Sequence, residues 1–117
     1  MIIHTTDSQL VGETVSTLFS MIQQGPVNCA IVVKNSGVNT MNYRFQTFNG
    51  TSWVDMGASG SDLYNTLSVN EVKLVEVDSS YPQVQMVGNA SGGAFVEFAI
   101  TRYVNRASGG AVPILNL

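Results

Sequence analysis

The sequence contains few charged residues. Lys, Arg, Asp and Glu make up 11% of its 117 residues, against roughly 25% in ordinary soluble domains. The cations are dispersed along the chain and the net charge is −3, so no basic stripe is present to neutralise phosphates, and we expect no nucleic-acid partner. Small polar residues must cover much of the surface. Because they lose less free energy on burial than charges do, such a surface suits packing against other proteins.

Cysteine and histidine occur once each. A single cysteine excludes an intrachain disulfide, and Cys29 opens the apolar run 29–33, where a buried small hydrophobe is expected. His4 stands near the N-terminus without partners at zinc-ligand spacing. The acidic residues do not follow a calcium-loop pattern: Asp55, Asp62, Glu71, Glu76 and Asp78. We therefore expect no metal, no cofactor and no catalytic constellation, and predict that the chain is not an enzyme.

Long apolar runs are also lacking. No stretch approaches the ~20 apolar residues of a membrane span, so we expect no membrane partner. Residues 1–7 do not combine a basic segment with a following apolar run, so no signal peptide is expected. These observations favour synthesis in the reducing cytoplasm of a host cell.

Short apolar segments with period-two alternation are abundant. Within 41–48, Met41, Tyr43 and Phe45 alternate with polar residues, which predicts a half-buried strand. Asn49-Gly50 follows, a pair that readily supplies the two positive-φ residues of a tight hairpin turn, and 53–56 would be the returning strand. Further strands are expected at 29–34, 69–77, 83–88 and 94–104, and we expect the last two to form a second hairpin.

Strands that recur about every ten residues predict an all-β protein, an antiparallel sandwich of immunoglobulin-like or jelly-roll type with Greek-key connections. Residues 9–24 are ambiguous. Their apolar positions fit helical spacing and Gly25-Pro26 could end a helix, but 14–17 are poor helix formers, and we favour a strand. We divide the chain into an N-terminal arm at 1–9, a sandwich domain at 10–104 and a C-terminal arm at 105–117.

The two ends of the chain are apolar. A Gly-rich joint at 105–110 precedes an apolar tip, and such a tip is most easily stabilised against a neighbouring subunit. The alternative is a tail that packs on its own domain. We predict protein contacts through Ile2, Ile3, Val112, Ile114, Leu115 and Leu117.

Exposed aromatic side chains on a β-sandwich can stack on sugars. Trp53 and Tyr64 are the candidates for such ligand stacking. The alternative is that Trp53 covers the hairpin core and that Tyr64 lies at a strand end with its hydroxyl in water.

Several segments together resemble a known family. They are the turn at 33–39, the strand 43–45, the hairpin 49–53, the segment 66–72 and the strand 93–103. They are similar to the small immunoglobulin-like or jelly-roll domains of tailed-bacteriophage virion proteins, head-decoration proteins included, and the resemblance covers about residues 10–104. It implies a non-enzymatic structural role, self-association, and attachment to a capsid or tail surface through termini and loops. It provides no catalytic residues.

The resemblance, with which the low charge density and the apolar C-terminal arm agree, thus implies a virion structural protein, a capsid decoration or stabilising protein that associates with itself and with a major capsid or other virion protein. Two alternatives remain open at this point. One is a tail, neck or fibre-attachment component, and the other is a carbohydrate-binding module.

Overall fold

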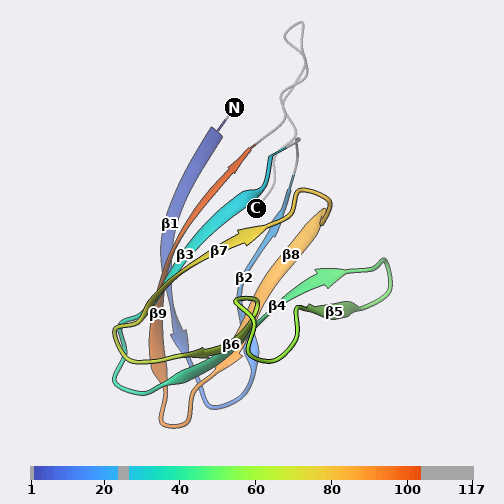
Figure 1. Cartoon of the computed structure of the whole chain (residues 1–117). Helices are drawn as coiled ribbons and strands as arrows, with labels where there is room; N and C mark the ends of the chain where they lie inside the picture. Colours follow the sequence, from blue (N-terminus) through green and yellow to red (C-terminus); the bar gives the residue numbers. More distant parts are fainter. Residues whose placement is uncertain (1, 24–26, 104–117) are drawn as a thin grey trace, which may run out of the picture.

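The computed structural model describes residues 2–23 and 27–103. These residues form nine strands and no helix: β1 (Ile2–Val11), β2 (Ser16–Ile22), β3 (Cys29–Asn35), β4 (Met41–Phe48), β5 (Trp53–Met56), β6 (Tyr64–Leu67), β7 (Val72–Val77), β8 (Gln83–Asn89) and β9 (Ala94–Tyr103). They build two antiparallel sheets packed as a sandwich, so the predicted all-β class is confirmed (Figure 1).

The order of the strands defines the type of sandwich. One sheet runs β1-β9-β3-β7, and the other runs β2-β8-β4-β5 with β6 also paired to β4. β5 and β6 lie end to end along one edge of β4, because β5 pairs with Phe45–Phe48 and β6 with Met41–Arg44. The pairs β1·β9, β2·β8, β3·β7 and β4·β6 are therefore nested one inside the next. This nesting is the jelly-roll arrangement.

The core lies between the sheets and is built from alternate residues of each strand. Met41, Tyr43 and Phe45 are fully buried, as their alternation predicted, and Ile31 and Val33 meet them from β3. Phe19 packs against Phe45 and Phe98 with ring centroids 6.1 and 4.7 Å apart. Aromatic and β-branched side chains thus fill the gap between the sheets, which is the main favourable contribution to folding.

The β4–β5 hairpin is present, but its turn differs from the predicted one. Phe48 pairs with Trp53, so the loop has the four residues 49–52, and only Gly50 of the Asn49-Gly50 pair has a positive φ, of 99°. The Asn49 side chain accepts hydrogen bonds from the backbone N–H groups of Thr51 and Ser52. The backbone N–H of Asn49 also donates to the carbonyl oxygen of Ser52 at 3.0 Å. Because these bonds close the four-residue loop, the two-residue mirror-image turn is not needed.

The second predicted hairpin is wrong. β8 pairs with β2 and β4, whereas β9 pairs with β1 and β3 in the opposite sheet. Gly92 and Gly93 in the connection both have positive φ, and the N–H of Ala90 donates to the carbonyl of Gly12. Both strands bury an apolar face in the core, and each does so from its own sheet.

Residues 9–24 contain strand structure, and the helical alternative is wrong. β1 ends at Val11, a short turn follows, and β2 begins at Ser16. β2 accommodates its mixed spacing with a bulge between Thr17 and Phe19, which lets both Leu18 and Phe19 turn toward the core.

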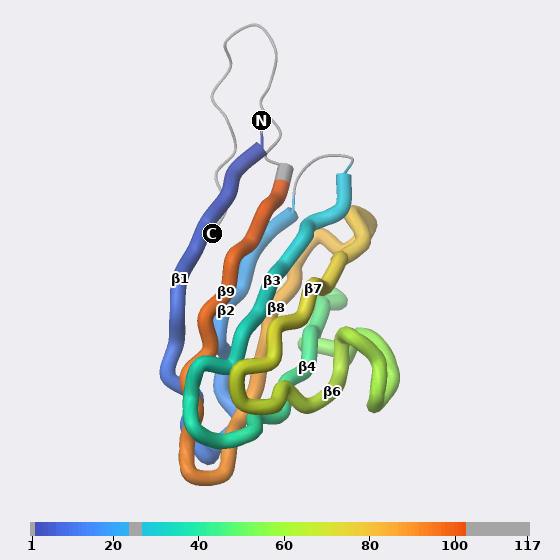
Figure 2. Tube along the Cα trace, turned by 60° about the vertical axis from the view of Figure 1, so that its left-hand side comes forward, coloured from blue at the N-terminus to red at the C-terminus, as the bar shows by residue number. Residues whose placement is uncertain are grey.

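Residues 2–9 belong to β1, which pairs with β9 in unbroken register from Ile2 to Val11. The boundary expected at residue 10 therefore does not coincide with a break in this strand. Figure 2 shows β1, β9, β3 and β7 side by side, with β2 and β8 behind them. The expected C-terminal arm, 105–117, lies outside the described residues.

Candidate functional site

Each sheet has one face in the core and one outer face, and the two outer faces differ in chemistry. We call the outer side of β1-β9-β3-β7 the apolar face. Over the length that all four strands share, register places its side chains in three rows across the strands. In the order β1, β9, β3, β7, the rows are His4-Thr101-Ala30-Glu76, Thr6-Ala99-Val32-Leu74 and Ser8-Glu97-Lys34-Val72.

Aliphatic side chains dominate β3 and β7 on this face. Leu74, Val72 and Val32 are 58%, 57% and 38% exposed. Lys34 and Glu97 are direct neighbours across β3 and β9. A shallow hollow of about 300 Å³ lies beside Val32, over the small side chain of Ala99. An exposed aliphatic surface with a hollow at its centre is typical of protein contact surfaces.

The outer side of the second sheet, which we call the amide face, is a hydrogen-bonded network. Gln85 Nε2 donates to Gln46 Oε1 at 2.7 Å, and Gln46 Nε2 donates to Asp55 Oδ1 at 2.8 Å. Asp55 also pairs with Arg44 at 3.5 Å. The network fixes the orientation of these side chains across β8, β4 and β5. A surface whose polar groups are fixed is better suited to recognise a polar ligand than a surface whose polar groups are mobile.

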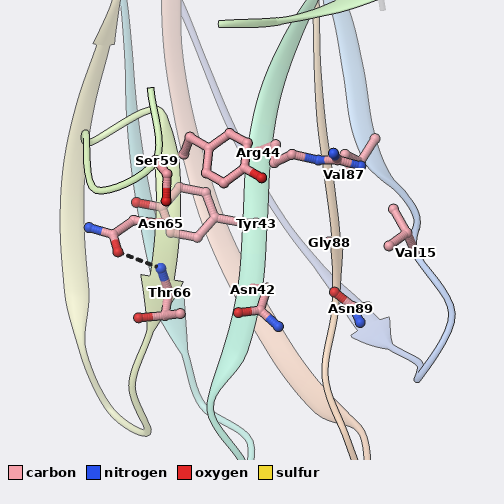
Figure 3. A pocket seen from close by; sticks show the side chains of 11 residues that line it. Val15, Asn42, Tyr43, Arg44, Ser59, Asn65, Thr66, Val87, Gly88 and Asn89 are labelled. Atoms are coloured by element: carbon pink, nitrogen blue, oxygen red, sulfur yellow. Dashed lines mark hydrogen bonds between the residues drawn. The ribbon is translucent and has the colours of Figure 1, made fainter. Parts of the chain in front are cut away.

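A hollow of about 350 Å³ lies at one end of the amide face (Figure 3). Arg44 reaches over the ring of Tyr64 with 5.9 Å between the guanidinium carbon and the ring centroid. Asn42 from β4 and Asn89 from β8 present amides to the same hollow, and Val15 and Val87 add aliphatic surface. Amides, a guanidinium and an aromatic ring around one concave site are the groups that bind hydroxyl-rich ligands.

Trp53 does not share this hollow with Tyr64. Its ring packs on Phe48 with centroids 5.3 Å apart, and it borders a separate hollow of about 210 Å³ beside Ser20 and Ile22. The row that contains Gln46 and Asp55 separates the two aromatic side chains. The structure therefore places both ligand-stacking candidates on one sheet face without bringing them together.

The predicted protein-contact residues fall in different parts of the chain. Ile2 is 61% exposed at the start of β1, and Ile3 is half-buried on the opposite side of that strand. The remaining four lie outside the described residues: Val112, Ile114, Leu115 and Leu117. A grouping of these six residues thus stays a prediction.

The groups with reactive potential are held in structural roles. Cys29 is fully buried, and this burial raises its thiol pKa to about 11, with Arg102 acting in the opposite direction. His4 is exposed on β1 and its Nδ1 is 2.8 Å from the hydroxyl of Thr101. Within residues 2–23 and 27–103, no three His, Cys, Asp or Glu side chains come together as metal ligands. In that same part of the chain, no helix is long and apolar enough to cross a membrane.

The apolar face was not among the predicted sites, although the sequence contains a signal for it. In the run Ala30-Ile31-Val32-Val33, both sets of alternate residues are apolar, and in 72–77 each set has two apolar residues and one charged one. A strand with two apolar sets is expected to be covered on both faces. The core covers one of them, and none of the residues 2–23 and 27–103 covers the other.

In comparisons with known proteins, similarity was found among solved structures. No protein-family model and no curated protein sequence matches it. Among solved structures, it is similar to a chain in the "Structure of infectious bursal disease virus Gx strain", with 17% identity and a TM-score of 0.36. The match covers 97% of this chain and 33% of that one, so this chain spans about a third of its length.

Proposed function

We propose that this protein is a non-enzymatic structural component of a virion, and that it decorates and stabilises a protein shell. The observation that carries the proposal is the apolar face. Val32, Val72 and Leu74 are exposed on a regular four-stranded sheet, and no described part of the chain covers them. A charge density of 11% supports the same role, because a surface with few charges loses little hydration when it packs against protein.

The mechanism follows from mass action. A protein that binds across the joints of an assembled shell binds the assembled state and not its free subunits. Binding of this kind stabilises the assembled state by RT ln(1 + [L]/Kd), about 2.7 kcal/mol at a hundredfold excess over Kd. This role needs a rigid domain and contact surfaces, and it needs no catalytic group.

The terminal segments are the proposed link to the shell, and their removal tests the proposal. Deleting 109–117 is expected to abolish incorporation into particles assembled without the chain, while circular dichroism shows an unchanged β-fold. The matched control replaces 109–117 with a Gly/Ser segment of equal length. Full decoration by the truncated protein would show that the C-terminal segment is not the link.

The position of the protein on the particle distinguishes decoration from the related role of a tail, neck or fibre-attachment component. Gold-labelled protein added to particles is expected on the shell surface in electron micrographs. Labelling confined to the tail or neck would replace the decoration role with attachment.

The hollow with Arg44 and Tyr64 favours a second candidate function, a carbohydrate-binding module. Under this proposal Tyr64→Ala abolishes binding on a glycan array, and Trp53→Ala reduces it less because Trp53 borders another hollow. Tyr81→Ala, at a 37% exposed tyrosine outside both hollows, is the control. If the folded wild-type protein binds no glycan at millimolar concentration, this function is excluded.

A further inference from the structure

We infer that the apolar face binds a second copy of this chain, and that the two copies pack face to face about a two-fold axis parallel to the strands. The inference specifies the self-association within the proposed function and rests on it in that respect. It is drawn from the positions of charged, large and small side chains in the three rows of the face.

A two-fold axis that runs along the strands, between β9 and β3, places each row opposite the same row of the second copy and reverses the order of the strands. β9 then lies opposite β3 of the second copy, and β1 lies opposite β7. Lys34 is in the same row as Glu97, so Lys34 faces Glu97 of the second copy, and Glu97 faces its Lys34. The symmetry thus forms two opposite-charge contacts from one pair of residues, as an isologous interface requires.

The middle row is complementary in shape. Val32 projects next to the hollow over Ala99, and the two share a row. Across the axis, Val32 of each copy faces the hollow of the other. Leu74, 58% exposed at one end of the row, faces Thr6 at the other end. Large side chains therefore meet small ones at both kinds of contact, and the symmetry repeats each contact. Such interdigitation is how two sheets fill the space of about 10 Å between them.

The third row gives a further polar contact. His4 and Glu76 occupy its two ends, so His4 of each copy faces Glu76 of the other. Both side chains are exposed in the single chain. The axis therefore brings each charged side chain of the three rows to an oppositely charged or polar partner, Lys34 to Glu97 and Glu76 to His4.

The alternative two-fold axis, perpendicular to the strands, does not produce this match. It places each strand opposite the same strand of the second copy and exchanges the two outer rows. Val72 then lies opposite Glu76, and Lys34 lies opposite Ala30. Charged groups would then lose hydration against aliphatic side chains without a partner. The arrangement of side chains thus selects one of the two face-to-face symmetries.

The area of the apolar face sets the expected affinity of the dimer. Four strands about 4.8 Å apart and under 30 Å long give a footprint on the order of 500 Å² per copy. This is at the low end of specific interfaces, whose partners bury about 800 Å² each. We therefore expect a dimer that dissociates in the micromolar range.

Charge-reversal substitutions test the interface, with the dissociation constant of the dimer measured by sedimentation equilibrium of the full-length protein. Lys34→Glu places like charges opposite each other twice and is expected to weaken the dimer at least tenfold. Glu97→Lys should do the same, and the double variant K34E/E97K should recover to within about threefold of wild type, because both pairs are restored with reversed sign. Circular dichroism checks the fold of each variant.

Two substitutions of an apolar by a charged residue, one on each sheet, give an independent test. Leu74→Asp is expected to abolish dimerisation, whereas Val54→Asp, at a 44% exposed valine of β5 in the other sheet, is expected to leave it unchanged. A wild-type protein that stays monomeric up to millimolar concentration would overturn the inference. So would a wild-type dimer that K34E, E97K and L74D all leave intact.

Cross-linking tests the symmetry itself. In one chain, residues 6 and 74 are three strand spacings apart, about 14 Å, whereas in the dimer they face each other. Thr6→Cys/Leu74→Cys should therefore give covalent dimers with a bismaleimide shorter than that spacing, and each single variant should not. Cys29 is fully buried and adds no background. Equal cross-linking of the single and double variants would exclude this axis.

The particle assay separates this inference from the shell role. If K34E is monomeric yet still decorates particles, the dimer is confirmed as distinct from shell docking. If wild type dimerises as described but binds no shell, the face-to-face interface stands and the decoration role fails.

Discussion

At the scale of single residues, Asn35 joins three parts of the chain. Its side chain is fully buried, and its Nδ2 donates to the carbonyl oxygens of Asn39 and Leu67 at 2.7 and 2.9 Å. Its Oδ1 accepts from the N–H of Gly37 at 3.0 Å. One amide thus satisfies backbone groups of the half-buried β3–β4 turn and of the buried end of β6.

Asn35→Ala should therefore lower the free energy of unfolding by about 2–4 kcal/mol, because backbone groups lose buried partners. Urea denaturation measures the change. Asn28→Ala is the control, since the exposed Asn28 side chain accepts one bond from the N–H of Ser79, and a loss below about 1 kcal/mol is expected. Equal losses in the two variants would contradict the role given to Asn35.

Cys29 gives a prediction on pH dependence. Burial raises the pKa of its thiol in the folded state to about 11, whereas the pKa of the same thiol in the unfolded chain lies near the ordinary value of 9.0. Between these two values the unfolded state loses the proton first. The free energy of unfolding should therefore fall as pH rises from about 9, and the loss should be complete above about 11.

The difference between wild type and Cys29→Ala isolates this effect, because the other groups that ionise at high pH are common to both proteins. The stability of wild type relative to the variant should decline between pH 9 and 11 and stay constant below pH 8. A constant difference over the whole range would show that the thiol is not shielded. Cys29 in the folded protein should also react with a thiol reagent only as fast as the chain unfolds.

At the scale of elements, the contact of β8 with β4 depends on a glycine. A Cβ on Gly88 would lie 2.5 Å from the backbone carbonyl oxygen of Asn42, so the two strands could not keep their spacing. Gly88→Ala should therefore destabilise the protein by about 1–3 kcal/mol in thermal or urea unfolding.

Gly12→Ala is the matched control for this substitution. A Cβ at residue 12 meets nothing within 4 Å, and a glycine replaced without strain restricts the unfolded chain. The control should be neutral or up to about 1 kcal/mol more stable. Similar destabilisation by both substitutions would mean that the β4–β8 approach is not the cause.

Individual elements could be predicted where their signals are local. The alternation in 41–48 identified β4, and the turn residues after it identified the hairpin with β5. The partner of β8 could not be predicted in this way. The residues between β8 and β9 are turn formers, but whether the chain returns in the same sheet or crosses to the other depends on apolar faces supplied by β1 to β4.

At the scale of the whole molecule, strand order was beyond the reach of sequence patterns for the same reason. β1 and β9 pair over ten residues although they stand at opposite ends of the described chain. The period-two signal in each strand says which side chains share a face, and it does not say which strand lies alongside. The candidate surfaces depend on that order, because the rows of the apolar face and the chain Gln85-Gln46-Asp55 exist only across strands.

Dimerisation through the apolar face should make the stability of the whole molecule depend on its concentration. The dimer contains only folded chains, so mass action transfers part of the binding free energy to folding. Well above the dissociation constant, free folded monomer grows with the square root of total protein, and each tenfold increase in concentration should add about 0.7 kcal/mol per chain.

Thermal unfolding of wild type should therefore shift upward with concentration through the micromolar range, and the K34E variant should show this shift only at concentrations at least tenfold higher. The K34E/E97K double variant should regain the wild-type dependence, since its facing charges are again opposite. A shift that K34E leaves unchanged would assign the self-association to another surface. In that case the exposed side chains of β3 and β7 would remain available to a shell partner of different sequence, and the particle assay with Leu74→Asp would identify it.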